Sequence, residues 1–134
     1  GISLKFSYNT SFTPYSNLIK AKIKTENGTF SVEGCLFDKK VIKLTKIMDY
    51  QIDVSPIGTM LLIKNQDVPG VVGKVGTALG SYNINIGEFI LSRKGTKDLA
   101  YSIIKIDSQI SNETLNKIKK LDEIVEIKQI SINE

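Results

Sequence analysis

Four closely spaced glycines at 70, 73, 76 and 80, in the stretch NQDVPGVVGKVGTALGSYNINIG (residues 65–87), restrict the fold of this chain more than any other feature. They follow an apolar run, as the glycines of a nucleotide-binding loop do. A phosphate loop needs its glycines before the helix, usually with a Lys-Ser/Thr pair or a G-x-G-x-x-G spacing. Here the glycines recur inside a predicted helix that follows Pro69, a natural first-turn residue: Gly70, Gly73, Gly76 and Gly80. The stretch is therefore not predicted to bind a nucleotide.

The predicted helix has two separate faces. At about 100° per residue, the glycines fall on one arc and the apolar side chains on the opposite arc. The apolar arc holds Val71, Val72, Val75, Ala78 and Leu79. Each glycine costs a helix about 1 kcal/mol relative to alanine, so four of them need a compensating reason. Close approach by another backbone or by a second subunit supplies one, and we expect self-association as a dimer or higher; easier packing within the chain is the alternative.

The chain of 134 residues contains no histidine and one cysteine, Cys35. Without histidine there is no Ser-His or Cys-His nucleophile pair, no imidazole base and no H-E-x-x-H metal site. A single cysteine forms no intramolecular disulfide framework, and no Cys/His cluster is available for zinc. We therefore expect no catalytic residue, no metal site and a cytoplasmic location.

The net charge of +4 is spread over many lysines rather than gathered in an arginine-rich block. This distribution favours solvated faces over a nucleic-acid surface. No apolar run approaches the roughly 20 residues that cross a bilayer, and the N-terminus lacks the order of a signal peptide. The sequence thus predicts a soluble protein of one domain or two small ones, with no nucleic-acid or membrane partner.

Residues 1–57 predict strands without a helix. In NLIKAKIK (residues 17–24), the apolar residues at 19, 21 and 23 alternate with the lysines at 20, 22 and 24, and the ENG turn joins this stretch to TFSVEGCLF in a hairpin. VIKLTKI and YQIDV predict a second hairpin, SPIG predicts a linker, and residues 1–17 have no strong pattern. Because four strands with nothing on their back make a poor autonomous domain, we expect residues 1–57 to belong to a larger domain.

Residues 58–134 predict a different order of elements. An apolar strand at 60–63 is followed by the glycine-rich helix, strands at 84–91 and 99–106, a second helix, and a last strand, IVEIKQISI. This is the β-α-β-β-α-β order of ferredoxin-like folds. Ser111 suits the N-cap of the second helix, and Ile110 and Leu115 suit a hydrophobic staple. The predicted class is α+β, with a ferredoxin-like domain preceded by an antiparallel β-rich partial domain.

Residues 65–89, NQDVPGVVGKVGTALGSYNINIGEF, resemble the opening of an ACT domain, a small amino-acid-binding regulatory module. The shared features are the D-x-P-G turn, the glycine-rich helix and the N-I-N-I strand start. The preceding VEGCLFDKKVIKLTKIMDYQIDVSPIG resembles the segment that leads into this domain in the longer bacterial D-3-phosphoglycerate dehydrogenases, with Cys35 for the usual Thr and Asp49 for the usual Gly.

This resemblance implies an organisation and a biological role. Residues 1–57 correspond to the C-terminal portion of an allosteric substrate-binding domain, and residues 58–134 to an ACT regulatory domain. The parent enzyme is then an NAD-dependent oxidoreductase of serine biosynthesis. Its nucleotide-binding and catalytic domains lie outside this chain, so we expect no cofactor here.

The turn before the glycine-rich helix offers the groups that a free amino acid needs. Asp67 can accept from the ammonium group, and the amides of Asn65 and Asn85 can serve either end. Backbone N–H groups from Gly70 onward lie at a helix N-terminus, which favours a carboxylate. The predicted effector-binding residues are Asn65, Asp67, Pro69, Gly70, Val71 and Asn85. Taken singly, these residues also suit ordinary turns, loops and helix starts.

The resemblance adds a ligand and a second site. It implies that the matching positions contact L-serine across a two-fold interface, where the turn of one subunit faces the strand start of its partner. It also matches Lys43 to a basic position at an anion pocket of the allosteric substrate-binding domain. The lysine neighbours of Lys43 make a solvated surface the alternative.

Other functions stay open. The beta subunit of bacterial L-serine dehydratase joins similar domains, and a generic amino-acid-binding ACT module is a further alternative. RNA-binding modules of the RRM type share the topology, but they stack bases on aromatic residues of the central strands, where this chain offers Phe89 and Tyr101. The missing histidine disfavours a stand-alone enzyme.

Overall fold

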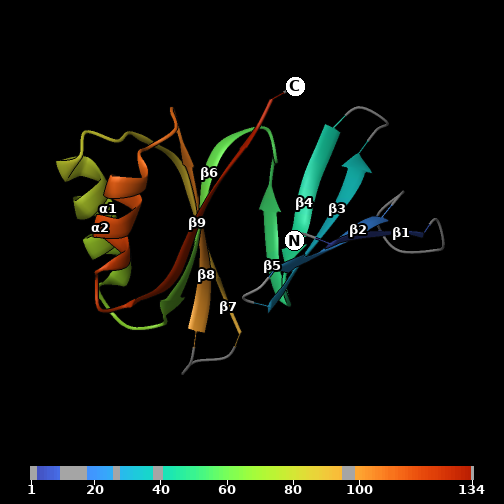
Figure 1. Cartoon of the computed structure of the whole chain (residues 1–134), viewed down its shortest axis with the longest axis horizontal. Helices are drawn as coiled ribbons and strands as arrows, with labels where there is room; N and C mark the ends of the chain where they lie inside the picture. The colour runs from blue at the N-terminus through green and yellow to red at the C-terminus, as the bar shows by residue number, and fades with distance from the viewer. Residues whose placement is uncertain (1–2, 10–17, 26–27, 38–40, 95–98, 134) are drawn as a thin grey trace. The chain divides into compact units, whose positions relative to one another are not determined.

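The computed structural model describes residues 3–9, 18–25, 28–37, 41–94 and 99–133. The chain forms two compact units, Gly1–Pro56 and Ile57–Glu134, whereas the predicted boundary lies between residues 57 and 58. Each unit contains one antiparallel sheet, and within the described ranges both helices belong to the second unit (Figure 1). The α+β class predicted from the sequence is confirmed.

The first unit is a five-stranded antiparallel meander. Its strands follow the chain in the order β1 (Ser3–Asn9), β2 (Leu18–Thr25), β3 (Gly28–Phe37), β4 (Val41–Ile47) and β5 (Tyr50–Val54). The β2–β3 and β4–β5 hairpins are as predicted, although residues 26–27 of the ENG turn lie outside the described residues. Strand β1 was not predicted, although Leu4, Phe6 and Tyr8 alternate with polar residues in the sequence.

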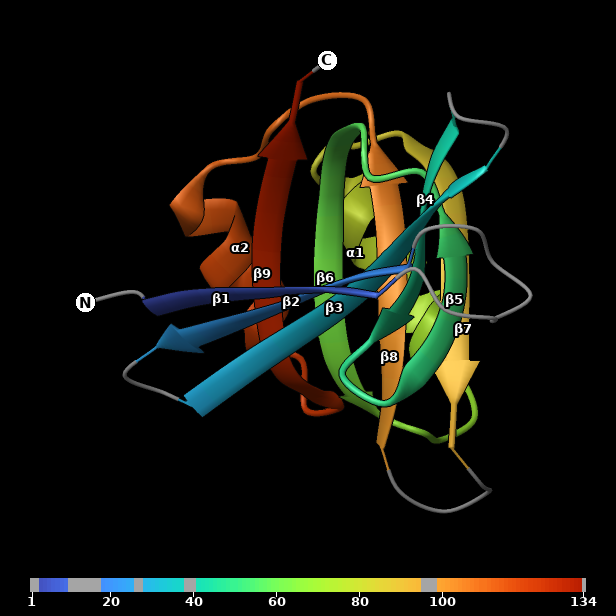
Figure 2. The same ribbon diagram turned by 90° about the vertical axis from the view of Figure 1, so that its right-hand side faces the viewer.

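The second unit has the predicted β-α-β-β-α-β order. Its elements are β6 (Gly58–Gln66), α1 (Val71–Ser81), β7 (Ile86–Arg93), β8 (Leu99–Ile106), α2 (Asn112–Lys119) and β9 (Ile124–Ile132). The sheet order is β7-β8-β6-β9, which leaves β7 and β9 at the two edges. Figure 2 looks onto this sheet, with β6 and β8 in its centre and the helices behind it.

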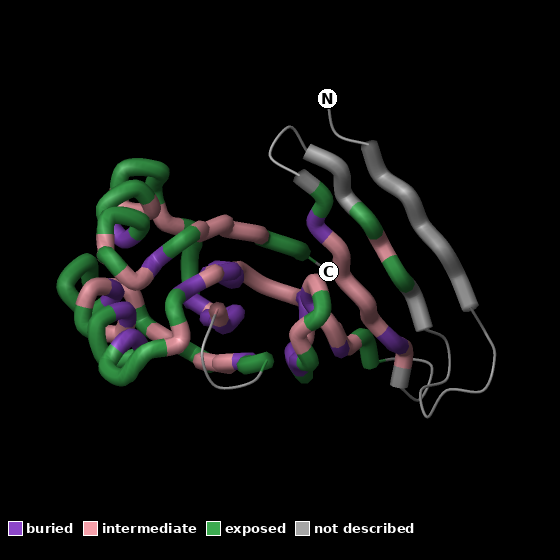
Figure 3. The backbone as a smooth tube through the Cα atoms, turned by 90° about the horizontal axis from the view of Figure 1, so that it is seen from below, coloured by how far each residue is buried: buried purple, intermediate pink, exposed green. Residues whose placement is uncertain are grey.

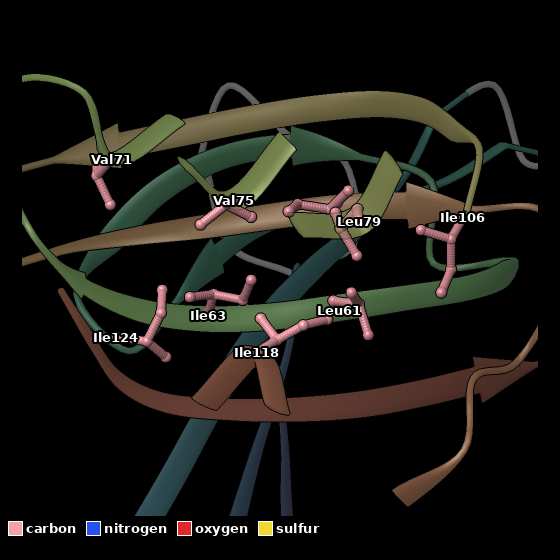
Figure 4. Close-up of a cluster of buried hydrophobic side chains, with 9 residues drawn as sticks. Leu61, Ile63, Val71, Val75, Leu79, Ile106, Ile118 and Ile124 are labelled. Carbon is pink, nitrogen blue, oxygen red and sulfur yellow. The ribbon is translucent and has the colours of Figure 1, made fainter. Parts of the chain in front are cut away.

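The two helices cover one face of this sheet and share one hydrophobic core. Val71, Val75 and Leu79 lie at i, i+4 and i+8 of α1 and are at most 4% exposed. They pack on Leu61 and Ile63 of β6 (Figure 4). The outer sides of both helices are exposed (Figure 3). Burial of these apolar faces fixes the turn between β6 and α1 over one end of the sheet.

One member of the predicted apolar arc of α1 is placed differently. Val72 belongs to the apolar arc that the sequence predicts, but it is 44% exposed. The three core contacts spaced four residues apart rotate α1 so that Val72 sits at the edge of the apolar face. The exposed side of α1 therefore carries Val72 together with the glycines.

Helix α2 begins as the sequence predicts. The hydroxyl of Ser111 accepts from the backbone N–H of Thr114 at 3.2 Å, which satisfies one of the free N–H groups of the first turn. Ile110 and Leu115 both pack against the core of the unit, as a hydrophobic staple requires.

Candidate functional site

Asp67 lies in the turn between β6 and α1, and its carboxylate is paired within the chain. The Nε of Arg93, the last residue of β7, donates to Oδ2 of Asp67 at 2.7 Å. The side chain of Asp67 is 10% exposed, whereas that of Arg93 is 51% exposed. Arg93 is not among the effector-binding residues predicted from the sequence. The sequence offered one signal for a special role of Arg93, because it is the one arginine in the chain.

Asn65 is buried beneath this turn. It lies in β6 rather than in the predicted turn, because pairing with both β8 and β9 extends the strand to Gln66. Its side chain is 1% exposed; its Oδ1 accepts from the hydroxyl of Ser102 at 2.9 Å, and its Nδ2 donates to the carbonyl of Gln66 at 3.0 Å. Both ends of the amide are thus engaged in the chain, where they hold the end of β6 in place.

Pro69 and Gly70 complete the turn before α1. The prediction that Gly70 lies inside the helix is wrong, because α1 begins at Val71 and Gly70 has a left-handed φ of 87°. A left-handed residue cannot continue a right-handed helix, and glycine adopts this conformation without strain. The side chain of Val71 is core, and its backbone N–H donates to the carbonyl of Val68 at 3.4 Å. Among the described residues, no side chain caps the first turn of α1.

Asn85 lies at the opposite end of the sheet from Asp67. At the Asp67 end of the sheet, Ala100 of β8 pairs with Asn65 of β6 and with Arg93 of β7. At the Asn85 end, Ile106 of β8 pairs with Thr59 of β6 and with Ile86 of β7. At roughly 3.3 Å per strand residue, these ends are about 20 Å apart. The Nδ2 of Asn85 donates to Oδ2 of Asp107 at 2.9 Å. A single chain therefore cannot place Asp67 and Asn85 on the same amino acid.

The glycines on the outer side of α1 pack against nothing in the described part of the chain. A Cβ atom built on Gly73, Gly76 or Gly80 meets no described heavy atom within 4 Å beyond the local helix backbone. The alternative that these glycines ease packing within the chain is therefore not supported. The outer side of α1 thus carries the exposed Val72 together with Gly73 and Gly76, which have open space beside them among the described residues.

An ion pair joins α1 to the segment before β9. The ammonium group of Lys74 contacts the carboxylate of Glu123. The hydrogen bond from Lys74 and its charge hold the pKa of Glu123 below its ordinary value, and Glu123 in turn raises the pKa of Lys74. This contact fixes the first half of α1 relative to the sheet through charge rather than burial.

Lys43 in the first unit is also paired. Its ammonium group lies 3.0 Å from Oδ1 of Asp53. A hollow of about 310 Å³ in the same unit has an apolar lining: Ala21, Val32, Gly34, Cys35, Leu36, Ile42 and Leu44. Lys43 is not part of that lining, so the hollow has no ammonium donor for an anion. Burial, with a smaller contribution from the negative charge of Asp53, raises the pKa of the Cys35 thiol.

The described residues contain neither a cluster of metal ligands nor a membrane-spanning helix. Within them, no group of three or more His, Cys, Asp or Glu side chains lies close enough to hold a metal ion. No helix in the described ranges is long and apolar enough to cross a membrane. Of the two aromatic residues considered for base stacking, Phe89 packs against the core beneath the helices and Tyr101 is 5% exposed.

Comparison with known proteins connects this geometry to a family. The ACT domain family matches residues 59–123. The chain is 29% identical to D-3-phosphoglycerate dehydrogenase of Methanocaldococcus jannaschii, over 92% of this chain and 24% of that protein. It is 36% identical to D-3-phosphoglycerate dehydrogenase 3, chloroplastic, of Arabidopsis thaliana, over 79% of this chain and 18% of that protein. It is 24% identical to the probable L-serine dehydratase, beta chain, of Bacillus subtilis, over 98% of this chain and 60% of that protein.

Residues 59–123 belong to the ACT domain family, whose members generally bind amino acids and dimerise. The β-α-β-β-α-β unit and the turn at Asp67 are the parts of the structure that this match covers. Over most of its length the chain is homologous to D-3-phosphoglycerate dehydrogenases, and it fits the regulatory part of such an enzyme. The chain spans about a quarter of the length of the first dehydrogenases it matches.

Proposed function

We propose that this chain is the regulatory part of a D-3-phosphoglycerate dehydrogenase and that it binds L-serine, the end product, as a feedback effector. The effector site is shared between two copies of the ACT unit. The oxidoreductase activity and its NAD cofactor belong to the parent enzyme. The glycines of this chain do not form a G-x-G-x-x-G cradle before α1, so NAD is assigned to another part of that enzyme.

The separation of Asp67 and Asn85 is the observation that supports a shared site. Strand β7 is an edge strand, and it runs parallel to β6 because both are antiparallel to β8. If two copies pair their β7 strands antiparallel about a two-fold axis, the start of one β7 faces the end of the other. That pairing brings Asn85 of one copy to the Asp67 end of its partner.

The outer surface of α1 supports the same assembly. Its glycines lower helix stability without packing against the described part of their own chain. Helix α1 precedes the edge strand β7, and a second copy on the β7 edge is the partner that gives these glycines a role. Small residues permit the backbones of two helices to approach closely.

The groups at the Asp67 turn suit an amino acid. Asp67 supplies a charged acceptor for the ammonium group, in a site that is largely enclosed. The first turn of α1 has no side-chain cap among the described residues, so its N–H groups can donate to an anionic group of the ligand. Asn85 of the partner copy adds a neutral amide, and Asn65 supports the turn from below.

The second candidate function is the regulatory part of an L-serine dehydratase beta chain. The Bacillus subtilis relative supports it, because the match covers 98% of this chain. An upstream reading frame that encodes a G-x-G-x-x-G nucleotide fold favours the dehydrogenase. A short beta chain without that fold favours the dehydratase.

Titration calorimetry of the chain with L-serine tests the proposed function. A charge-assisted hydrogen bond is worth about 1.5–3 kcal/mol, so Asp67→Ala should weaken serine binding by about ten-fold to over a hundred-fold. Asn85→Ala removes a neutral group and should cost less. Lys117→Ala, which removes a lysine from α2, should bind like the wild type. No heat with millimolar serine, or wild-type affinity in Asp67→Ala, rejects the site.

A further inference from the structure

Arg93 is the group that contacts the proposed ammonium acceptor. Its Nε bonds to one carboxylate oxygen of Asp67, Oδ2. A carboxylate has two oxygens and about four lone-pair positions, so this bond leaves room for a second donor. The guanidinium group has five N–H donors, and the bond to Asp67 uses the one on Nε. The half-exposed Arg93 side chain and the largely covered Asp67 side chain thus form a charged pair with capacity for further polar contacts.

Arginine at position 93 can make contacts that lysine cannot. Of the 18 basic residues in the chain, Arg93 is the one that is not lysine. A lysine ammonium group is a point charge, which is sufficient to pair with an aspartate. A guanidinium group is planar and can hold a second carboxylate through two parallel N–H bonds. The carboxylate of a ligand can accept these two further N–H bonds.

We propose that Arg93 binds the α-carboxylate of the effector while Asp67 binds its α-ammonium group. This assignment rests on the proposed function and identifies the chemical class that the site selects, a free zwitterionic amino acid. The ligand enters between the two side chains and exchanges one internal ion pair for two ion pairs with the ligand. Total charge is unchanged by this exchange, because a zwitterion carries one charge of each sign.

The same exchange explains why partial ligands are rejected. A simple amine satisfies Asp67 but separates it from Arg93, which then loses its partner. A simple carboxylic acid satisfies Arg93 but leaves the largely covered carboxylate of Asp67 without one. An unpaired charge in a partly enclosed site is unfavourable. Both groups of the amino acid are therefore needed for tight binding.

The position of Arg93 also agrees with the shared site. Arg93 is the last residue of the edge strand β7, and Ile86 is the first. In an antiparallel β7 pair across a two-fold axis, Arg93 of one copy faces the start of β7 in the other copy, next to Asn85. Arg93 then lies between Asp67 of its own chain and Asn85 of the second copy.

The test uses titration calorimetry of the 134-residue chain at about pH 6, where α-amino groups are protonated. The three ligands are L-serine, L-serinamide, which lacks the carboxylate, and 3-hydroxypropionate, which lacks the ammonium group. The wild type should bind serine about ten-fold to a hundred-fold more tightly than serinamide. Arg93→Ala should weaken serine by a similar factor and bring the serine-to-serinamide ratio close to one. Arg93→Lys should restore part of that ratio.

Lys117→Ala is the matched control, because Lys117 is also a half-exposed cation in an ion pair, 3.1 Å from Glu113 on α2. It should keep the wild-type affinities. If Arg93→Ala weakens serine and serinamide equally, Arg93 only positions Asp67, and the assignment fails. Tighter serine binding by Arg93→Ala also overturns it, because Arg93 then competes with the ligand for Asp67.

Two further results are decisive. If binding by Arg93→Ala is too weak to measure, the ratio for Arg93→Lys decides: an intermediate ratio supports the assignment and a wild-type ratio overturns it. Failure of the proposed function looks different, because the wild type then binds none of the three ligands. If the Arg93 variants bind serine and keep the wild-type ratio of serine to serinamide affinity, only the role of Arg93 is rejected and the proposed function stands.

Discussion

The two helices of the second unit cover the same core but follow opposite local rules. Helix α2 has Ser111 as its N-cap, Glu113 in its first turn, and Lys117 and Lys119 in its last turn. These groups satisfy free N–H groups and complement the helix dipole. Helix α1 has no side-chain cap among the described residues and no charged side chain of the complementary sign in its terminal turns. It also contains glycines with open space beside them.

This contrast separates a helix built for stability from one built for contact. Both helices are anchored by buried apolar residues, Leu79 in α1 and Ile118 in α2. Local stability in α2 comes from its own sequence. Helix α1 instead depends on the core and leaves its N-terminus and outer side available. Such departures from local rules are expected at functional sites.

The largest predicted effect concerns the glycines of α1. The double variant Gly73→Ala and Gly76→Ala should raise the free energy of unfolding of the monomer by about 1–2 kcal/mol, because each alanine favours the helix by about 0.5–1 kcal/mol. The added methyl groups meet open space in the chain itself. They should nevertheless weaken self-association at least about ten-fold if a second copy packs there. Urea unfolding at low concentration and sedimentation equilibrium measure the two effects.

Gly34→Ala is the control for this pair of effects. A Cβ atom at Gly34 lies 3.1 Å from the carbonyl oxygen of Lys43, so this alanine should destabilise the chain. An unchanged association constant in the α1 double variant contradicts the interpretation of α1 as a contact surface. Loss of stability in that variant contradicts the open space beside the glycines.

A smaller effect is predicted at the start of α2. Ser111→Ala removes the hydroxyl that accepts from the N–H of Thr114, and it should lower the free energy of unfolding by about 1 kcal/mol. Serine affinity should not change, because Ser111 is outside the Asp67 turn. Urea unfolding with calorimetry on the same sample checks both statements. A change of serine affinity alone contradicts the division of roles between the helices.

The smallest effect is the pH dependence of the contact between Lys74 and Glu123. Because the pKa of Glu123 is lowered in the folded chain, the pair stabilises the fold above the ordinary glutamate pKa of about 4.3 and loses its effect as pH falls through the lower folded pKa. The difference in Tm between the wild type and Glu123→Gln should therefore be present at neutral pH and shrink in acid. If the difference in Tm between the wild type and Glu123→Gln does not depend on pH, the side chain of Glu123 acts through packing rather than charge.

The parts of the fold that are set by local pattern were predictable. Residues 124–132 and 99–106 have the apolar patterns of β9 and β8, and Ser111 marks the start of α2. The element order of the second unit follows from these signals. The glycine pattern also predicted that the glycines of α1 lie on a different face from its core residues.

The details of the candidate site were less predictable because they depend on non-local pairing. Asn65 is buried in β6 since two neighbouring strands extend β6 past it. The contact of Arg93 with Asp67 requires the register of three strands, β6, β8 and β7, which no local pattern reveals. Gly70 lies outside α1 because its left-handed φ ends the turn, and sequence periodicity does not report that angle.

The most direct test of a site shared between two copies is complementation between two defective variants. Asp67→Ala and Asn85→Ala should each bind serine poorly, and each should still self-associate by sedimentation. If every site combines Asp67 of one copy with Asn85 of the other, each mixed dimer has one intact site. An equal mixture after subunit exchange should therefore regain about one quarter of the wild-type number of serine sites, at wild-type affinity. A mixture that binds no more serine than the separate variants contradicts the shared site.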